Sequence, residues 1–183
     1  MYTVELTATN AGGSDVAGVN FEYKLVPSHV VNCQLGFTLQ NGKYDTALNQ
    51  GENTFTDKVL RSTNQYGYLL VNLNPSHHTE LSINGTYTGP MHMVHLGGGL
   101  DKNGMLIEES LVKTNSFYDL GFKFAYHIDF GDQMKIEFNA GVKNLFNSFQ
   151  DDPDYGNSRD ATYVYGPISP RTFFFGISLG NVL

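Results

Sequence analysis

Two short segments of the chain carry side chains that could bind a metal ion or a small ligand. The first is Met91-His-Met-Val-His95. Thioether and imidazole groups suit soft or borderline ions, so this segment is compatible with contact to copper or haem. The alternative is that a strand ends here and that its Met and His side chains line a wall. We expect His92 and His95 to lie at the mouth of a long loop, as candidates for ligand contact with no metal assigned.

The second segment places three carboxylates within four residues, at Asp151, Asp152 and Asp154. Hard oxygen ligands at this density could hold Ca²⁺ and order a loop, but the order of acids and glycine that marks an EF-hand is absent. The alternative is a solvated acidic loop in which Arg159 and Asp160 pair. These three carboxylates and Arg159 join His92 and His95 as the residues expected in substrate-binding loops.

No other segment has the pattern of an enzyme active site. No Ser-His-Asp or Cys-His set has a meaningful spacing. Gly97-Gly-Gly99 lacks the strand-to-helix setting and the lysine of a phosphate-binding loop, and His77 and His78 follow Pro75 in a polar turn. The lone Cys33 cannot form an internal disulfide and falls on an apolar position of its strand. We therefore expect neither catalysis nor a cofactor.

Composition limits the classes of partner. The net charge of −7 leaves no basic stripe to neutralise phosphates, which argues against nucleic acid. Aromatic residues make up 13% of the chain without any Trp, and only 16% of residues are charged. No stretch approaches the roughly 20 consecutive apolar residues of a membrane-spanning helix.

The segments that must position these loops alternate between apolar and polar residues. In Met134–Lys143 every second residue is apolar, and in an extended strand such residues share one face. The pattern is less clean near Leu69, because Tyr68 and Leu70 take the other phase. No Asp, Glu, Lys or Arg interrupts the apolar phase of any run. The alternation predicts eight strands, whose apolar positions span 2–8, 19–25, 31–39, 69–73, 81–87, 118–130, 134–142 and 173–179.

The opposite phase of the same strands is hydrophilic. A charge that faces lipid near the middle of a bilayer costs about 2–4 kcal/mol, so charges confined to one phase are expected for a membrane wall with a wet inner side. We expect these charged residues to face the lumen of a barrel. They are Glu22, Lys24, Lys123, Lys135, Glu137 and Lys143.

The connections between the predicted strands alternate in length. Those at 27–29, 75–78 and 131–132 are short and turn-forming, whereas those at 10–18, 44–65, 88–115 and 147–170 are mostly long and rich in Gly, Asn, Asp and Pro. Short periplasmic turns and long extracellular loops are typical of an outer-membrane barrel. The strand at 118–130 rises about 30 Å when tilted by about 45°, enough for a hydrocarbon layer. The predicted fold is an all-β, antiparallel transmembrane β-barrel segment of about eight strands.

Several of these segments resemble one protein family. Gly141-Val-Lys-Asn-Leu-Phe-Asn147 is similar to the Asn-Leu-Phe-(Asn/Asp) signature on the penultimate strand of TonB-dependent outer-membrane receptors. The last strand of that family resembles Tyr165-Gly-Pro167 followed by Pro170-Arg-Thr-Phe-Phe-Phe-Gly-Ile-Ser-Leu179, where Pro-Arg opens an aromatic-alternating strand. Residues 18–27, 36–45 and 87–91 also resemble receptor segments, in family order and in a Bacteroidota-like style.

The resemblance implies a barrel of 22 strands, of which residues 1–183 are the C-terminal part. Such receptors lie in the outer membrane of Gram-negative bacteria, in contact with its lipid. Their lumen holds an N-terminal plug domain, and through the plug the TonB-ExbB-ExbD system supplies energy for uptake. Their substrates are scarce or bulky, such as iron–siderophore complexes, haem or cobalamin. The sequence lacks the plug and the earlier strands, so we expect a fragment of a receptor for an extracellular iron chelate or a similar ligand.

Two alternatives stay open at the level of sequence. The chain could be a complete eight-stranded outer-membrane barrel with an anchoring or adhesion role, in which the first and last strands pair and the interior is filled by side chains. It could also be a soluble β-sandwich or a lipocalin-like binding protein. The soluble fold predicts that Phe122, Phe124, Ile136 and Phe138 face a dry core rather than lipid.

Overall fold

The computed structural model is an all-β, antiparallel structure, and it describes residues 12–130 and 134–181. The described residues form the following strands: β1 (Ser14–Ser28), β2 (Val31–Asn49), β3 (Phe55–Lys58), β4 (Gln65–Ser76), β5 (Thr79–Thr88), β6 (His92–His95), β7 (Ser110–Lys113), β8 (Phe117–Phe130), β9 (Met134–Lys143) and β10 (Thr172–Asn181). None of the described residues forms a helix long and apolar enough to cross a membrane.

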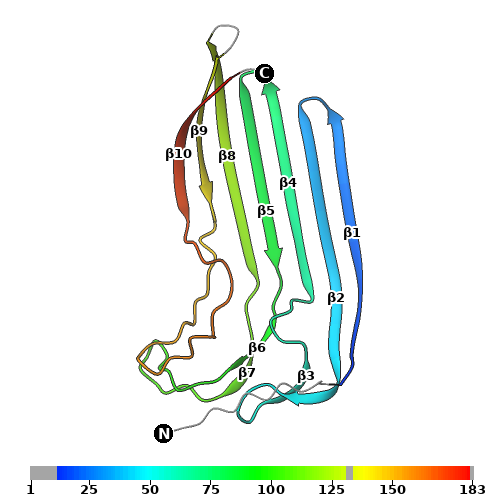
Figure 1. Ribbon diagram of the computed structural model, residues 1–183, viewed down its shortest axis with the longest axis vertical. Helices are drawn as coiled ribbons and strands as arrows, with labels where there is room; N and C mark the ends of the chain where they lie inside the picture. The colour runs from blue at the N-terminus through cyan, green and yellow to red at the C-terminus, as the bar shows by residue number, and fades with distance from the viewer. Residues whose placement is uncertain (1–11, 131–133, 182–183) are drawn as a thin grey trace.

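One large sheet contains most of the strands, in the order β1-β2-β4-β5-β8-β9-β10, with β3 paired to the end of β2 (Figure 1). Strands β6 and β7 form a separate two-stranded sheet. Among the described residues no pairing joins β1 to β10, so the sheet is open. The predicted antiparallel all-β class is confirmed, whereas closure into a barrel is not seen. The strand predicted at 2–8 and the turn predicted at 131–132 lie outside the described residues.

The register brings the predicted apolar positions onto one face of the large sheet. Residues directly opposite each other in an antiparallel pair point to the same face. Every strand boundary along the path from β1 to β10 contains apolar pairs of this kind. Examples are Phe21 with Phe37, Leu35 with Leu69, Val71 with Ile83, Ile83 with Phe122, Phe124 with Ala140, and Phe138 with Ile177.

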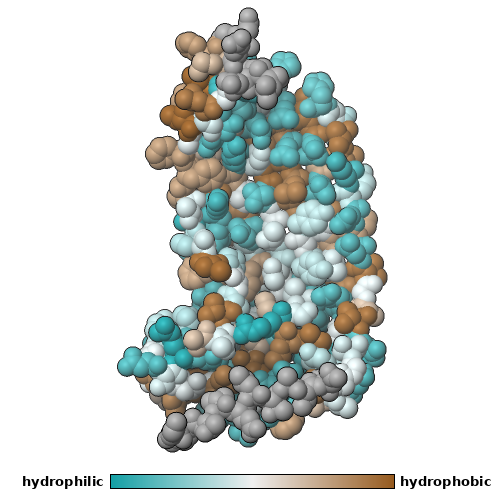
Figure 2. All heavy atoms as spheres, viewed as in Figure 1, coloured by the Kyte–Doolittle hydropathy of each residue, from teal (hydrophilic) through white to brown (hydrophobic). Residues whose placement is uncertain are grey.

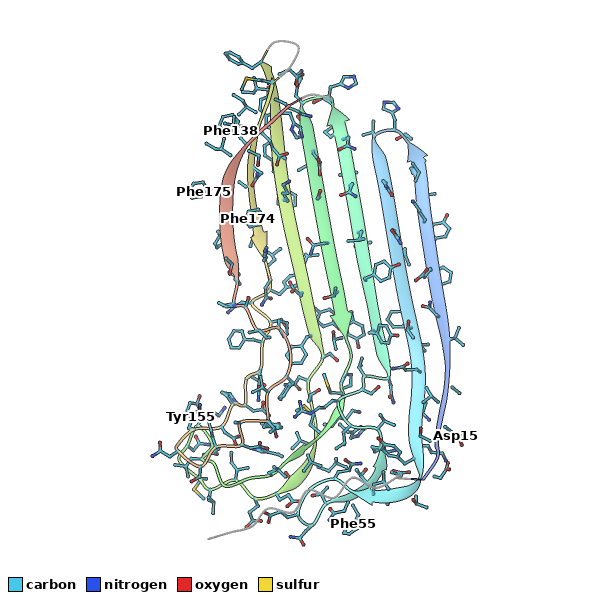
Figure 3. The ribbon with its side chains drawn as sticks, viewed as in Figure 1. Asp15, Phe55, Phe138, Tyr155, Phe174 and Phe175 are labelled. Atoms are coloured by element: carbon cyan, nitrogen blue, oxygen red, sulfur yellow. The ribbon has the colours of Figure 1, made fainter. Side chains whose placement is uncertain are left out.

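No described element covers this apolar face. Phe175 is 90% exposed, Val19 69% and Phe124 37%. Figure 3 shows Phe138 and Phe175 projecting outward from β9 and β10. Phe122 and Phe138 are exposed as well, so the dry core that a soluble sandwich requires is absent from the described residues.

The opposite face of the sheet is hydrophilic. In Figure 2 hydrophilic side chains cover much of the middle of the sheet. Lys123 Nζ donates a hydrogen bond of 3.1 Å to Glu137 Oε1, and the imidazole of His127 lies 3.7 Å from Glu137 and 4.0 Å from Glu80. Tyr68 packs across Gly36 of the neighbouring strand and accepts a hydrogen bond from Gln34. The second phase therefore carries polar contacts on β2, β4, β5, β8 and β9.

Turns and loops segregate to opposite ends of the sheet (Figure 1). Short turns join β1 to β2 and β4 to β5, and the long connections lie at the far end. Two expected loop boundaries were wrong: β1 begins at Ser14, and β2 continues to Asn49. Beyond the apolar band the two strands still pair, as at Asp15 and Lys43, because a backbone ladder needs no apolar side chains.

One cluster of buried side chains lies among the long loops and the start of β8. Met93, Phe117, Tyr163 and Tyr165 form a buried cluster, with Met91 and Val112 packed against it. The loops are thus a folded unit at one end of the sheet, and they hold the residues expected to bind ligand.

Candidate functional site

The long connections fold together into what we call the loop cluster, which consists of residues 50–64, 89–116 and 144–171. Glu109 joins the second connection to the first. Its carboxylate accepts hydrogen bonds from Thr54 Oγ1 at 2.6 Å and from the backbone N–H groups of Asn53 and Glu52. The Thr54 bond and the backbone bonds together hold the pKa of Glu109 below its usual value, against desolvation. Arg61 donates to the carbonyl of Thr162 and so joins the first connection to the third.

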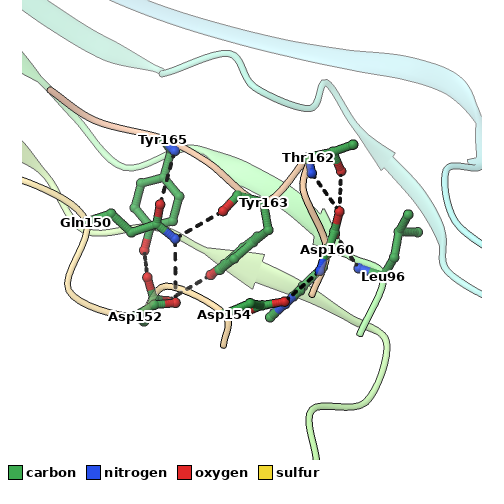
Figure 4. A network of polar contacts seen from close by, with 9 residues as sticks. Leu96, Gln150, Asp152, Asp154, Asp160, Thr162, Tyr163 and Tyr165 are labelled. Carbon is green, nitrogen blue, oxygen red and sulfur yellow. Dashed lines mark hydrogen bonds and ion pairs between the residues drawn. The ribbon is translucent and has the colours of Figure 1, made fainter. Parts of the chain in front are cut away.

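Asp152 is the centre of one hydrogen-bond network in the loop cluster (Figure 4). Tyr163 donates its hydroxyl to Asp152 at 2.8 Å, and Tyr165 donates to the other carboxylate oxygen. Burial, reinforced by these bonds to an anion, raises the pKa of both tyrosines well above the ordinary value. Gln150 completes the network with bonds to the carbonyl of Tyr163 and the N–H of Tyr165. The two hydroxyls thus act as fixed donors.

Asp154 forms a second network with His95. Nε2 of His95 lies 2.8 Å from one oxygen of Asp154 and 2.9 Å from the other, and both side chains are almost fully buried. The imidazole also stacks on the ring of Tyr163, with centroids 3.8 Å apart and planes within 2° of parallel. His95 therefore connects strand β6 to the β9–β10 connection through its contacts with Asp154 and Tyr163.

Asp160 fixes the neighbouring backbone. Its carboxylate accepts hydrogen bonds from the N–H of Leu96 at 3.0 Å and from both the N–H and the hydroxyl of Thr162, and its own N–H donates to Asp154. Burial opposes ionisation of this carboxyl, but the bonds from Thr162 and Leu96 outweigh it and hold the pKa below the usual value. The ionised Asp160 carboxylate therefore holds the backbone of Leu96 and Thr162 in place.

The Asn144-Leu-Phe-Asn147 segment forms the turn that ends β9. Asn144 is 2% exposed and Asn147 is open to solvent, and both have positive φ, at 48° and 54°. The Asn144 amide donates to the carbonyls of Ser148 and Ser169 and accepts from the N–H of Ser148. Asn147 accepts from the N–H of Arg171, which directly precedes β10. The two segments that resemble the receptor family therefore contact each other and set the entry into the last strand.

A cavity of about 480 Å³ opens within the loop cluster. Its lining combines carboxylates, aromatic rings and aliphatic groups, and comes from the second and third connections. Its polar lining includes His95, Asp101, Asn115, Asp151, Asp152 and Tyr155.

The structure brings some of the predicted ligand-contact residues together and separates others. His95, Asp151 and Asp152 line the cavity, and Asp154 is bonded to His95. His92 pairs with Lys113 in the two-stranded sheet, and burial followed by Lys58 and Lys113 lowers its pKa. Arg159 is exposed, and the pairing expected between Arg159 and Asp160 is not present among the described contacts. The reason is that backbone and hydroxyl donors already occupy Asp160.

The described residues contain no group of three or more His, Cys, Asp or Glu side chains arranged to hold a metal ion. The acidic run does not converge because its members have different partners: Asp151 accepts from Asn115, Asp152 from two tyrosines, and Asp154 from His95.

The charged residues expected on a lumen wall all lie on the hydrophilic face of the sheet. Lys123 bonds Glu137, Lys143 Nζ lies 5.8 Å above the ring of Phe174, and Lys135 pairs in register with Asp129. Glu22 and Lys24 are exposed on β1. That this face lines a lumen stays a prediction.

Sequence reasoning missed the aromatic part of the site. Tyr163, Tyr165 and Gln150 carry the network around Asp152, yet they lie in a connection without periodicity. The only available signal was the Tyr-Val-Tyr spacing, which puts two tyrosines on one side of an extended segment.

A further cavity of about 650 Å³ lies at the turn end of the sheet, where His29, His77, His78 and His127 gather around the short turns.

Comparison with models of protein families finds no match for this chain. Comparison with curated proteins finds no match either.

Proposed function

We propose that this chain is the C-terminal part of the β-barrel of a TonB-dependent receptor in the outer membrane of a Gram-negative bacterium. The receptor takes up a scarce, bulky substrate, such as an iron–siderophore complex, haem or cobalamin, with energy delivered by the TonB-ExbB-ExbD system through a plug encoded elsewhere in the protein. The barrel is the 22-stranded one of that family, and its turns face the periplasm.

The observation that carries the proposal is the uncovered apolar face of the large sheet. From β1 to β10 this face has no Asp, Glu, Lys or Arg within the apolar band, although its aromatic side chains are widely exposed. In water, an exposed apolar face of this extent would drive aggregation, whereas hydrocarbon is its natural environment. The hydrophilic second face suits an aqueous lumen.

Three further features support the receptor over a small closed barrel. The described edges of β1 and β10 are open, as expected for one arc of a larger barrel. The long connections form a folded cluster with a cavity, as expected for ligand-binding loops. The two segments that resemble the receptor family interact through Asn147 and Arg171.

The lipid-facing side is testable with the adjacent residues Phe174 and Phe175, which belong to opposite faces of β10. The chain has no tryptophan, so Phe174→Trp and Phe175→Trp each add one indole to this segment. The fluorescence of each variant is measured in reconstituted vesicles, and the signal of the parent protein is subtracted. We expect lipids brominated in the acyl chains to quench the Phe175→Trp indole and to leave the Phe174→Trp indole unquenched. Equal quenching of both, or of neither, contradicts a membrane wall.

Uptake is testable in the bacterium that makes the complete gene product. Cells should accumulate labelled ferric siderophore, haem or cobalamin, and accumulation of one of these should disappear when the gene is deleted or when a protonophore collapses the inner-membrane gradient. If deletion leaves accumulation of all three classes unchanged, or if the protein fractionates outside the outer membrane, the receptor assignment is wrong.

A further inference from the structure

The cavity in the loop cluster is lined by carboxylates, aromatic rings and aliphatic side chains. At about 480 Å³ it has the size of a small-molecule site. Its polar lining comes from connections far apart in sequence, since His95 and Asp101 precede β8 whereas Asp151 and Asp152 follow β9.

His95 contributes its imidazole to this cavity. The side chain is only 6% exposed, and its Nε2 faces the Asp154 carboxylate at 2.8–2.9 Å. Because His95 lines the cavity, its ring is part of the surface that a ligand would meet.

The carboxylates around the cavity add acceptor capacity and negative charge. Asp151 receives one long bond, 3.3 Å from the Asn115 amide. Asp152 receives two tyrosine hydroxyls, which satisfy its oxygens without neutralising its charge. Asp101 accepts only from its own turn, where the Met105 bond followed by other local bonds keeps its pKa low and the group ionised. Against these three carboxylates, Lys102 contributes one ammonium, and its side chain is exposed.

Aromatic rings complete the lining. Tyr155 is 50% exposed and lines the cavity, and so does Tyr163, whose ring also packs against His95 and Tyr165. The faces of such rings attract ammonium and guanidinium groups. Ile107, Val112 and Pro153 supply aliphatic surface for the carbon chain of a ligand.

We propose that this cavity binds an organic cation that carries several N–H donors on an aliphatic chain, such as an alkyl polyamine. The carboxylates of Asp101, Asp151 and Asp152 and the ring of Tyr155 are the recognising groups. This inference goes beyond the proposed function because it adds a ligand of the loop cluster, and it rests on that function only for the outward position of the loops.

The test is isothermal titration of spermidine into the complete gene product, purified in a non-ionic detergent. We expect saturable binding, weakened about tenfold by Asp151→Asn and by Tyr155→Leu, since each removes one charge-assisted or aromatic contact. Glu52→Gln is the matched control because Glu52 is an exposed acid of the loop cluster that does not line the cavity. It should bind spermidine as the parent does. 1,8-Octanediol, an uncharged chain, should not bind.

Absence of saturable binding overturns the inference, as does equal weakening by Asp151→Asn and Glu52→Gln, which would indicate diffuse charge attraction. Binding of the diol as strongly as spermidine also overturns it. Because Tyr155→Leu leaves all carboxylates in place, it decides the matter if Asp151→Asn fails to fold. An outer-membrane protein that does not bind spermidine overturns this inference alone, whereas a protein outside the membrane that binds it overturns the receptor assignment alone.

Discussion

The imidazole of His95 lies parallel to the ring of Tyr163 at a centroid distance of 3.8 Å, and the same two residues reach separate carboxylates, Asp154 and Asp152. One stacked pair therefore connects both hydrogen-bond networks of the loop cluster. Since His95 ends β6 and Tyr163 belongs to the β9–β10 connection, the pair determines how these loops sit relative to each other.

Loss of the Tyr163 hydroxyl should weaken this connection. Tyr163→Phe keeps the stack on His95 and removes only the bond to Asp152, so we expect a loss of about 1–2 kcal/mol in loop stability. The measurement is the rate of limited proteolysis within residues 144–171 of the folded protein. Tyr155→Phe is the control because Tyr155 is half exposed and has no hydroxyl bond among the described residues, and it should change the rate little. Equal effects of the two variants contradict the network.

Alkaline pH should destabilise the loop cluster through Tyr163 and Tyr165. The pKa of each is raised above the ordinary 10.0, by burial first and by Asp152 second. Above pH 10 the unfolded chain loses these protons while the folded protein keeps them. The stabilisation is therefore complete below pH 10 and declines as the pH rises toward the folded pKa values. Denaturation of the parent and of the Tyr163→Phe/Tyr165→Phe variant at about pH 8 and about pH 11 checks this, because the variant should lose less stability between the two.

The strands could be predicted from the sequence because alternation is a local property. Phe122, Phe124 and Ile128 fall on one face of β8 by period alone, and the register places them beside apolar residues of the neighbouring strands. The extension of β2 to Asn49 could not be predicted, since its residues beyond Leu39 are largely polar and the ladder is held by backbone bonds.

The site was only partly predictable for a related reason. The run of Asp151, Asp152 and Asp154 suggested one shared site, but each carboxylate meets a different partner from a distant segment. Contacts between residues 59 positions apart, such as His95 with Asp154, leave no periodic trace in a single sequence. His95 ends β6, within the connection between β5 and β8, and its contact with a ligand stays a prediction.

The turn after β9 should depend on Asn144 more than on Asn147. Both have positive φ, so glycine keeps the backbone conformation and removes only side-chain bonds. Asn144→Gly loses three bonds in a buried position, whereas Asn147→Gly loses one that is exposed. We expect a cost of about 2–4 kcal/mol for the first and about 1 kcal/mol or less for the second. Thermal unfolding in detergent measures both, and a larger effect of Asn147→Gly contradicts the role of Asn144.

Gly36 and Tyr68 should be energetically coupled across β2 and β4. A Cβ at position 36 would meet the Tyr68 ring, which covers the glycine and is bonded by Gln34. Gly36→Ala should therefore displace the ring and cost about 1–3 kcal/mol, as overpacking usually does. In the Tyr68→Ala background the same change should cost little. A double-mutant cycle measures the coupling, and additive effects would mean that the ring does not lie over the glycine.

Ile83 and Asn84 offer the sharpest separation of the two faces of the sheet, since they are neighbours on β5. Ile83 pairs with Val71 and Phe122 on the apolar face, and Asn84 pairs with Leu70 and Gly121 on the hydrophilic face. Ile83→Asp places a carboxylate among apolar groups and, in a bilayer, should cost about 2–4 kcal/mol, whereas Asn84→Asp adds the same charge to a wet surface. Heat-modifiable gel mobility of the protein from outer membranes should reveal a lower folded fraction for Ile83→Asp only. If Asn84→Asp is the more damaging change, the hydrophilic face does not line water and the orientation of the sheet is reversed.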